Sequence, residues 1–222
     1  MENNMTNKQN NGGESALKGS CLWGILLFFI LVIVDQLTKI FADAYFSQPN
    51  TPDRIAVIPD WIYLCITYNK GISYGMGANA PTVLKMAVIV GTAVLMSLFA
   101  MFYFQVDKRR TLLRIAIVFV VAGGVGNLID RIYFEVWDPN AAFGVRDMVD
   151  LNRFGFAVCN FADFFISAGA VMLVLSLLFF DKDAIFPLTK KYKELAKEAA
   201  EEEERKQAEK AEKKAKETQG KE

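Results

Sequence analysis

Four long apolar runs dominate the pattern of hydrophobic and polar positions along the chain. They cover residues 21–41, about 83–104, about 112–134 and about 158–180. A helix of about 20 apolar residues crosses the hydrocarbon core of a bilayer, which is roughly 30 Å thick. The pattern therefore predicts four transmembrane helices.

Basic residues indicate which ends of these helices face the cytoplasm. The short connection between the second and third runs is basic, and lysines follow the fourth run; these residues are Lys108, Arg109, Arg110 and Arg114, then Lys182, Lys190, Lys191 and Lys193. Cytoplasmic loops carry an excess of Lys and Arg. We therefore expect both termini in the cytoplasm, with residues 42–82 and 135–157 on the outer side.

The first outer segment contains two short stretches of β-branched and aromatic residues, at 55–58 and 61–68. Such stretches around a turn are typical of strands. The predicted fold class is thus an all-α membrane protein, with four transmembrane helices and a small extracytoplasmic β-sheet between helices 1 and 2. The predicted organisation is a polar cytoplasmic N-terminus (1–20), a four-helix domain (21–180) and a charged cytoplasmic tail (181–222).

Composition narrows the possible chemistry. The net charge is zero, with 25 basic and 25 acidic residues, which gives no reason to expect nucleic acid as a partner. Histidine is absent, so a Ser-His-Asp or Cys-His nucleophile and an imidazole zinc site are excluded. The three cysteines are too scattered for a CxxC motif. We predict no metal and no cofactor, and expect carboxylates, Lys, Tyr or Cys to carry any proton chemistry.

Polar residues inside the predicted helices converge on one level of the membrane. Apart from flanking Lys and Arg, the charged and amide side chains lie at the outer ends in the predicted topology, as do two aspartates of the segment before the fourth helix. The set is Asp35, Thr38, Lys39, Asn127, Asp130, Arg131, Asn160 and Asp163, with Asp147 and Asp150. A charge at the centre of a membrane helix costs about 2.5 kcal/mol or more, so such residues mark function or pairing.

Spacing leaves two interpretations of these residues open. Asp35 with Lys39, and Asp130 with its neighbour Arg131, would make buried ion pairs that hold the bundle together. This ion-pair interpretation does not extend to Asp147 and Asp163, for which the pattern offers no obvious basic partner. Two carboxylates placed close together share a proton, so that one can activate water while the other protonates a carbonyl oxygen. This is amide hydrolysis of the aspartyl type.

Three other classes compete with a peptidase of this type. A small transporter would use the carboxylates for ions, but the chain shows no internal repeat of the kind that transporters contain. A scaffold subunit would use the charged tail to bind its partner. A presenilin-type protease would need a G-x-G-D signature, whereas Gly126 is followed here by Asn127.

Five motifs, in order, resemble the lipoprotein signal peptidase (signal peptidase II) family. They are Asp35-Gln-Leu-Thr-Lys39, Asn69-Lys-Gly71, Gly124-Val-Gly-Asn127-Leu-Ile-Asp130-Arg131, Val145-Arg-Asp147-Met-Val-Asp150 and Asn160-Phe-Ala-Asp163. The resemblance implies an aspartyl endopeptidase of the bacterial inner membrane. Its substrates would be prolipoproteins carrying a diacylglyceryl group, cleaved just before the lipidated cysteine.

The resemblance also implies roles for individual residues. Asp147 and Asp163 would be the catalytic pair. The expected positioning residues are Asn127, Arg131 and Asn160, and those expected to hold the site together and contact substrate are Asp35, Lys39, Asn69, Gly71 and Asp130. We expect the peptidase to act as a monomer in contact with membrane lipid.

The chain departs from the family pattern at several points. The connection from Arg131 to Asp147 is longer than is usual in the family, which leaves Asp150 as an alternative to Asp147. Residues Ser73, Tyr74 and Phe164 differ from those common in the family, and the charged tail lies outside the family core. None of these departures removes a catalytic group.

Overall fold

The computed structural model describes residues 2–71, 80–108 and 110–180, and residues 194, 197–198, 200–202 and 204–208 of the tail. Several residues used in the sequence analysis lie outside these ranges; they are Ser73, Tyr74, Arg109, Lys182, Lys190, Lys191 and Lys193.

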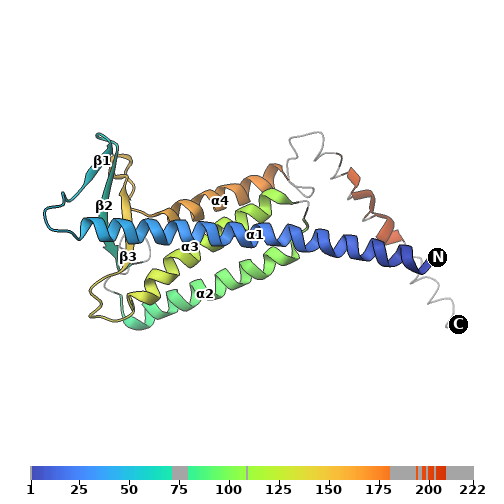
Figure 1. The fold of residues 1–222 in the computed structure, drawn as a ribbon, viewed down its shortest axis with the longest axis horizontal. Helices are drawn as coiled ribbons and strands as arrows, with labels where there is room; N and C mark the ends of the chain where they lie inside the picture. Colours follow the sequence, from blue (N-terminus) through green and yellow to red (C-terminus); the bar gives the residue numbers. More distant parts are fainter. Residues whose placement is uncertain are drawn as a thin grey trace.

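Four helices form the body of the protein (Figure 1): α1 (Glu2–Phe46), α2 (Thr82–Gln105), α3 (Thr111–Tyr133) and α4 (Phe161–Phe179). Within the described ranges, these four are long and apolar enough to cross a membrane, and in α1 the apolar part is Leu22–Phe46. The predicted spans are confirmed. The last helix begins slightly later than predicted because Asn160 caps it instead of lying inside it.

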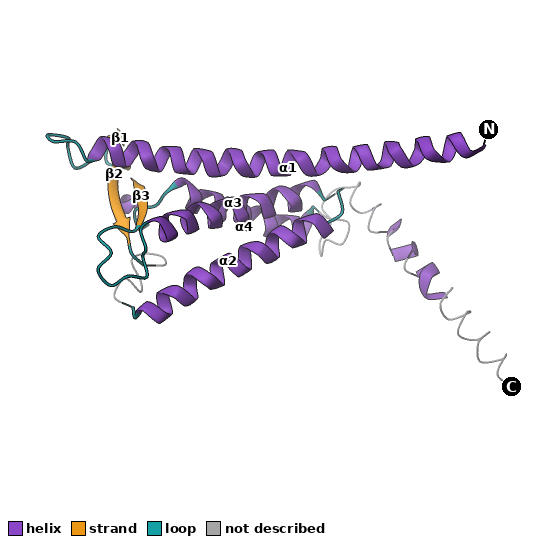
Figure 2. Ribbon diagram, turned by 60° about the horizontal axis from the view of Figure 1, so that its bottom comes forward, coloured by secondary structure: helices purple, strands orange, loops and turns teal. Residues whose placement is uncertain are grey.

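The helix α3 is the centre of the bundle and contacts each of the other three. In its most apolar stretch 61% of the residues are buried, against 17% in α1, 11% in α2 and 17% in α4. Figure 2 shows α1, α2 and α4 arranged around α3. The outward faces of these three helices carry large exposed apolar side chains such as Phe29, Leu98 and Val174, a surface suited to lipid.

Glycines on α3 allow its neighbours to approach closely. A Cβ atom at Gly123 would clash with the carbonyl oxygen of Ala162 and the side chain of Ile166 on α4. A Cβ atom at Gly126 would press against the carboxylate of Asp35 on α1. Small residues bring membrane helices together in this way because packing, and not water, drives their association.

An antiparallel sheet lies at one end of the bundle (Figure 1). Its strands are β1 (Ile55–Ile58), β2 (Ile62–Asn69) and β3 (Val145–Asp150), in the order β1-β2-β3. The predicted sheet between α1 and α2 is confirmed. It gains a third strand that the sequence analysis did not predict, because β3 comes from the segment between α3 and α4.

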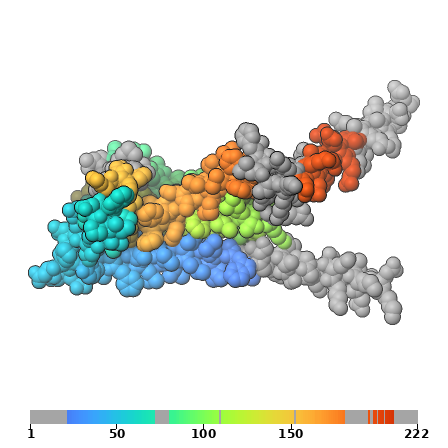
Figure 3. Space-filling view, turned by 90° about the horizontal axis from the view of Figure 1, so that it is seen from above, coloured from blue at the N-terminus to red at the C-terminus, as the bar shows by residue number. Residues whose placement is uncertain are grey.

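The sheet covers the end of the bundle at which α1 and α3 finish and α4 begins. Both β2 and β3 contact α1, and β3 also contacts α3. In Figure 3 the strand region (teal) packs on the end of α1 (light blue), beside the start of α4 (orange). The backbone of Cys159 pairs with Val149 of β3. This pairing ties the strand to the residue that precedes the cap of α4.

We expect the substitution Gly123→Leu to destabilise the protein. The added side chain would force α4 away from α3, and overpacking of this kind costs about 1–3 kcal/mol. The matched control is Gly91→Leu on α2, since no atom lies within 4 Å of a Cβ placed there. Thermal unfolding of the purified proteins in detergent should give a Tm lowered by several degrees for Gly123→Leu alone. Equal Tm values for the two variants would contradict this description of the α3–α4 contact.

Candidate active site

The site begins with the cap of α4. The side chain of Asn160 accepts a hydrogen bond from the backbone N–H of Asp163, and the Asp163 carboxylate accepts one from the backbone N–H of Asn160, both at 3.1 Å. This reciprocal arrangement is a capping box, which satisfies N–H groups left free at a helix start. It also fixes the Asp163 carboxylate beside the first turn of α4.

Two asparagines connect Asp163 with Asp147. The Nδ2 of Asn160 donates to Asp147 Oδ1 at 2.6 Å and to Asn127 Oδ1 at 3.0 Å. The Nδ2 of Asn127 donates to Asp163 Oδ1 at 2.8 Å. The two carboxylates therefore come from β3 and α4 and share one hydrogen-bonded bridge of amides.

Asp147 is buried on the central part of β3, with 3% of its surface exposed. It lies opposite Thr67 of β2, and the side chain of Asn69 also hydrogen bonds to it. Burial, followed by the negative charge of Asp163, raises the pKa of Asp147 to about 7, against the lowering effect of the Asn160 and Asn69 hydrogen bonds and the Lys39 charge. Near neutral pH this carboxyl can therefore hold or release a proton.

Asn69 has a second role at the end of β2. Its Oδ1 accepts a hydrogen bond from the backbone N–H of Gly71 at 2.8 Å. This is an Asx turn, in which a side chain mimics a backbone turn. The turn orients the amide that reaches Asp147.

The helix α1 contributes a fully buried ion pair. Lys39 Nζ lies 2.9 Å from the Asp35 carboxylate and donates to Asn127 Oδ1 at 3.0 Å. The other oxygen of Asp35 accepts the backbone N–H of Ala162 at 2.9 Å. The Asp35–Lys39 ion pair, one of the two interpretations that spacing left open, is present, and it ties α1 to α3 and to the start of α4.

Asp130 pairs mainly with a residue that the sequence analysis did not single out. Its carboxylate accepts hydrogen bonds from Arg146 Nη2 at 2.7 Å and Nε at 3.2 Å, and lies 3.7 Å from Lys39 Nζ. The sequence-based alternative paired Asp130 with Arg131. Arg131 interacts electrostatically most strongly with Asp163, then with Asp147, and only then with Asp130. It is therefore the basic neighbour of the two aspartates that spacing alone did not reveal.

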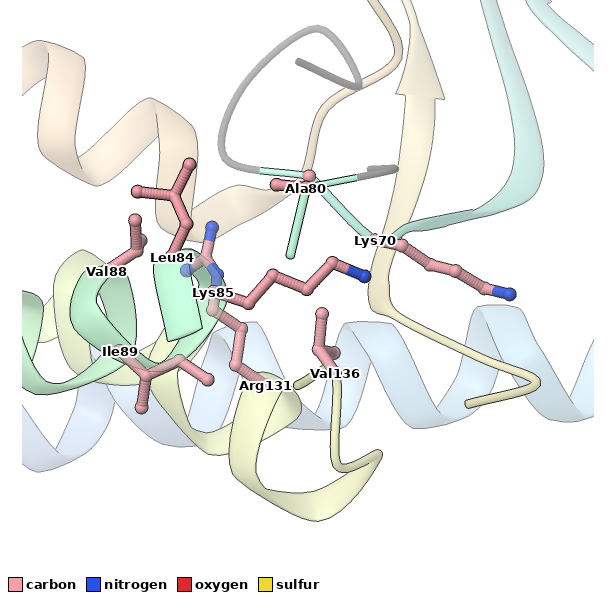
Figure 4. Close-up of a pocket in the computed structure, with 9 residues that line it drawn as sticks. Lys70, Ala80, Leu84, Lys85, Val88, Ile89, Arg131 and Val136 are labelled. Carbon is pink, nitrogen blue, oxygen red and sulfur yellow. The ribbon is translucent and has the colours of Figure 1, made fainter. Parts of the chain in front are cut away.

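A small cavity of about 30 Å³, large enough to hold a water molecule, lies beside Arg131 (Figure 4). Figure 4 shows Arg131 reaching from α3 toward the start of α2 and Ala80. The lining residues are Lys70, Gly71, Ala80, Leu84, Lys85, Val88, Ile89, Arg131 and Val136. A larger apolar groove of about 270 Å³, lined by residues such as Gly24 and Tyr103, lies at the opposite end of the bundle. The small cavity, and not the larger groove, is lined by Arg131, which interacts electrostatically with both Asp163 and Asp147.

The structure brings together nearly all the residues that the sequence analysis selected. Asp35, Lys39, Asn69, Asn127, Asp130, Asp147, Asn160 and Asp163 are joined by the contacts above, with Arg131 and Gly71 beside the small cavity. Asp150, the alternative to Asp147, pairs instead with Tyr63 at the far end of β3. In the ranges that the structure describes, no group of three or more His, Cys, Asp or Glu residues is arranged to hold a metal ion.

Sequence reasoning missed Gln36 and Arg146. Gln36 Nε2 donates to the backbone oxygen of Gly126 and to Asp35, both at 3.0 Å, and its Oε1 accepts from Arg146 at 3.4 Å. Both residues lie inside the quoted motifs. Spacing gave no signal for them, because their contacts with Gly126, Asp130 and each other join residues far apart in the chain.

The fold and the site define a multi-pass membrane protein with a buried carboxylate pair at one end of its helices. The chain matches the signal peptidase II family over residues 27–179. It is 28% identical to the lipoprotein signal peptidase of Fusobacterium nucleatum (74% of this chain, 91% of that protein) and 33% identical to that of Bifidobacterium longum (78% and 85%).

Solved structures agree with these relatives. Two structures, each described as a bacterial membrane enzyme, superpose with TM-scores of 0.57 and 0.56 at 25% and 26% identity. Each covers 70% of this chain, and the match spans 87% and 92% of those proteins. The chain belongs to the signal peptidase II family. It is a peptidase that removes signal peptides from prolipoproteins, and the comparisons do not support the transporter alternative.

We expect Asp163→Asn to lower the pKa of Asp147. The charge of Asp163 is a cause that raises this pKa, so its removal should let Asp147 ionise at lower pH. The protonated-carboxyl band in infrared spectra, followed from pH 5 to pH 9, measures the midpoint. The exposed Asp60→Asn serves as the control, and an unmoved midpoint in Asp163→Asn would show that the two carboxylates are not coupled.

Proposed function

We propose that Asp147 and Asp163 together hydrolyse the peptide bond between signal peptide and lipoprotein. The observation that carries this proposal is the bridge between them: Asn160 donates to one carboxylate and caps the helix that presents the other. No histidine is present in the chain, so carboxylates are the natural groups to activate water here.

The two aspartates differ in a way that suits acid and base roles. Asp163 accepts hydrogen bonds from Asn127 and from a backbone N–H at the start of α4. Both donors, together with the positive end of the helix dipole, stabilise a negative charge. Asp147, with its pKa of about 7, is the member that holds the proton. Asp163 is therefore the general base and Asp147 the general acid.

The reaction then follows in two proton-balanced steps. Asp163 takes a proton from water while the water oxygen bonds to the scissile carbonyl carbon, and Asp147 gives its proton to the carbonyl oxygen. In the second step the C–N bond breaks, Asp163 protonates the leaving nitrogen, and the hydroxyl of the intermediate returns its proton to Asp147. This restores the starting state of the pair.

The remaining polar residues support this chemistry. Asn127, Arg131 and Asn160 position the substrate and the carboxylates. The Arg131 guanidinium also stabilises the negative charge that develops on the carbonyl oxygen. Asp35, Lys39, Asp130, Asn69 and Gly71 hold the ends of α1, α3 and β2 around the pair. Metal and cofactor play no part in this scheme.

We further propose a substrate and an orientation finer than the family assignment. The substrate is a prolipoprotein whose cysteine already carries a diacylglyceryl group, and cleavage occurs just before that cysteine. The enzyme is a monomer of the bacterial inner membrane in contact with lipid, with both termini cytoplasmic and the sheet on the outer side. The basic connection at Lys108 and Arg110 supports this orientation through the positive-inside rule.

Asparagine substitutions test the catalytic pair. We expect Asp147→Asn and Asp163→Asn each to lower cleavage of a diacylglyceryl-modified prolipoprotein by about 100-fold or more, since each removes a proton-transfer group with little change in shape. The matched control is Asp150→Asn, three residues along the same strand. Mass loss on a gel measures cleavage, and Tm values in detergent show whether the variants fold. Turnover by a folded Asp163→Asn variant would refute the assignment.

Removal of the tail from Leu188 onward separates the enzyme from the scaffold interpretation. We expect the truncated protein to cleave substrate at a rate within about twofold of the full chain, because charge runs of this kind are usually solvated. The same gel assay measures this rate. Loss of cleavage in a folded truncation would favour a tail that binds a partner.

A further inference from the structure

We propose that Arg146, next to the catalytic Asp147, is a positioning residue. Its positive charge neutralises the buried charged cluster that contacts the aspartate pair. It acts through Asp130 and Lys39 and does not contact the scissile bond. This inference rests on the proposed function of Asp147 and Asp163. Neither the motif spacing nor the family assignment gives Arg146 a role.

Arg146 is held by one carboxylate through three separate hydrogen bonds. Its backbone N–H donates to Asp130 Oδ2 at 2.9 Å, its Nε to the same oxygen at 3.2 Å and its Nη2 to Oδ1 at 2.7 Å. The guanidinium also lies over the ring of Phe134, 5.3 Å from its centroid. A planar fork that can grip both carboxylate oxygens is a property of arginine and not of lysine.

The contact between Arg146 and Asp130 is linked to the aspartate pair through residues of α1 and α3. Asp130 lies 3.7 Å from Lys39 Nζ, and the same Nζ donates to Asn127 Oδ1 at 3.0 Å. Asn127 in turn donates to Asp163. Without the positive charge of Arg146, Asp130 would attract Lys39 more strongly, and this would weaken the Lys39 contact with Asn127, whose amide holds the catalytic base.

Charge balance gives Arg146 its importance. Asp35, Lys39, Asp130 and Arg146 are all buried, and they comprise two negative and two positive groups. The half-buried Asp43 of α1 adds a further negative charge that acts on Arg146. Burial lowers the pKa of Arg146, but the hydrogen bonds and charge of Asp130 outweigh this and raise it overall, so the arginine stays charged. Without it, the cluster would carry one excess negative charge.

Alternation along β3 separates the two neighbouring side chains. Arg146 lies opposite Tyr68 and Asp147 opposite Thr67, and successive side chains of a strand point to opposite faces. Asp147 reaches Asn160, whereas Arg146 reaches Asp130. The side chain of Arg146 therefore lies on the opposite face of β3 from the side chain of Asp147, the catalytic acid.

The groups that act on the pair come from every element around it. Asp147 interacts with Lys39 of α1, Arg131 of α3 and Asp163 of α4. The thiols of Cys65 and Cys159 are also nearby, and burial raises the pKa of each, so both remain neutral at pH 7. An excess negative charge at Asp130 adds to this set and favours the protonated forms of both aspartates.

The test is the pH profile of kcat for Arg146→Gln. We expect kcat to fall about 10-fold. We also expect the midpoints of the acidic and basic limbs of the profile to move upward by about 0.5–1 pH unit, which is the effect expected from a partly screened buried charge. A simple loss of folded protein would lower the rate without moving the limbs. Arg146→Lys should restore the wild-type limbs but only part of kcat, because it keeps the charge and loses the fork. Arg153→Gln, an exposed arginine of the same outer segment, should match the wild type.

The double variant Asp130→Asn with Arg146→Gln isolates the route of the effect. It removes both charges, so its limbs should return toward those of the wild type. Unmoved limbs in Arg146→Gln, or equal shifts in Arg146→Gln and Arg146→Lys, would overturn the proposal. If Arg146→Gln does not fold, the pH profiles of Arg146→Lys and of the double variant are compared with that of the wild type instead. Wild-type cleavage with none by Asp163→Asn establishes the proposed function independently.

Discussion

The need to keep buried charges neutral governs the end of the bundle where the carboxylates lie. Asp35, Lys39 and Asp130 are completely buried, and Arg146 nearly so. An unpaired charge in such a place is strongly destabilising, whereas a paired cluster with further hydrogen bonds is tolerated. The cluster draws on α1, α3 and β3, and Asp35 also holds the first turn of α4. The elements that carry the aspartate pair are therefore held together by one buried cluster, which must remain electrically neutral.

The small sheet is needed because it brings a strand to the capped start of α4. A helix end leaves backbone groups unsatisfied, and α4 solves this with Asn160 and Asp163. The strand β3 brings Asp147 to the same cap, and it is held in place on one side by β2 and on the other by Cys159. The carboxylates meet because a strand and a helix start share Asn160. Neither element would place its aspartate alone.

Sequence alone predicted the helices and the two strands β1 and β2, because hydropathy and β-branched stretches are local signals. It also predicted the Asp35–Lys39 pair, whose partners are one helical turn apart. It did not predict β3, since Val145–Asp150 has no regular alternation of charged and apolar residues and becomes a strand only through pairing with β2. The partnership of Asp130 with Arg146 was missed for a similar reason: its two residues lie 16 positions apart and meet through the fold. The residue types of the site could be recognised from the sequence, but the contacts between residues far apart in the chain could not.

Under the proposed mechanism, the same physics gives the two aspartates different roles. Asp163 is half-buried and lies on the first turn of a helix, where two N–H donors and the helix dipole favour negative charge. Asp147 lies on a buried strand, where loss of water favours the neutral form. A pair built from two identical environments would need a substrate to break its symmetry. Here the fold breaks the symmetry beforehand, because one carboxylate comes from a helix cap and the other from the interior of a sheet.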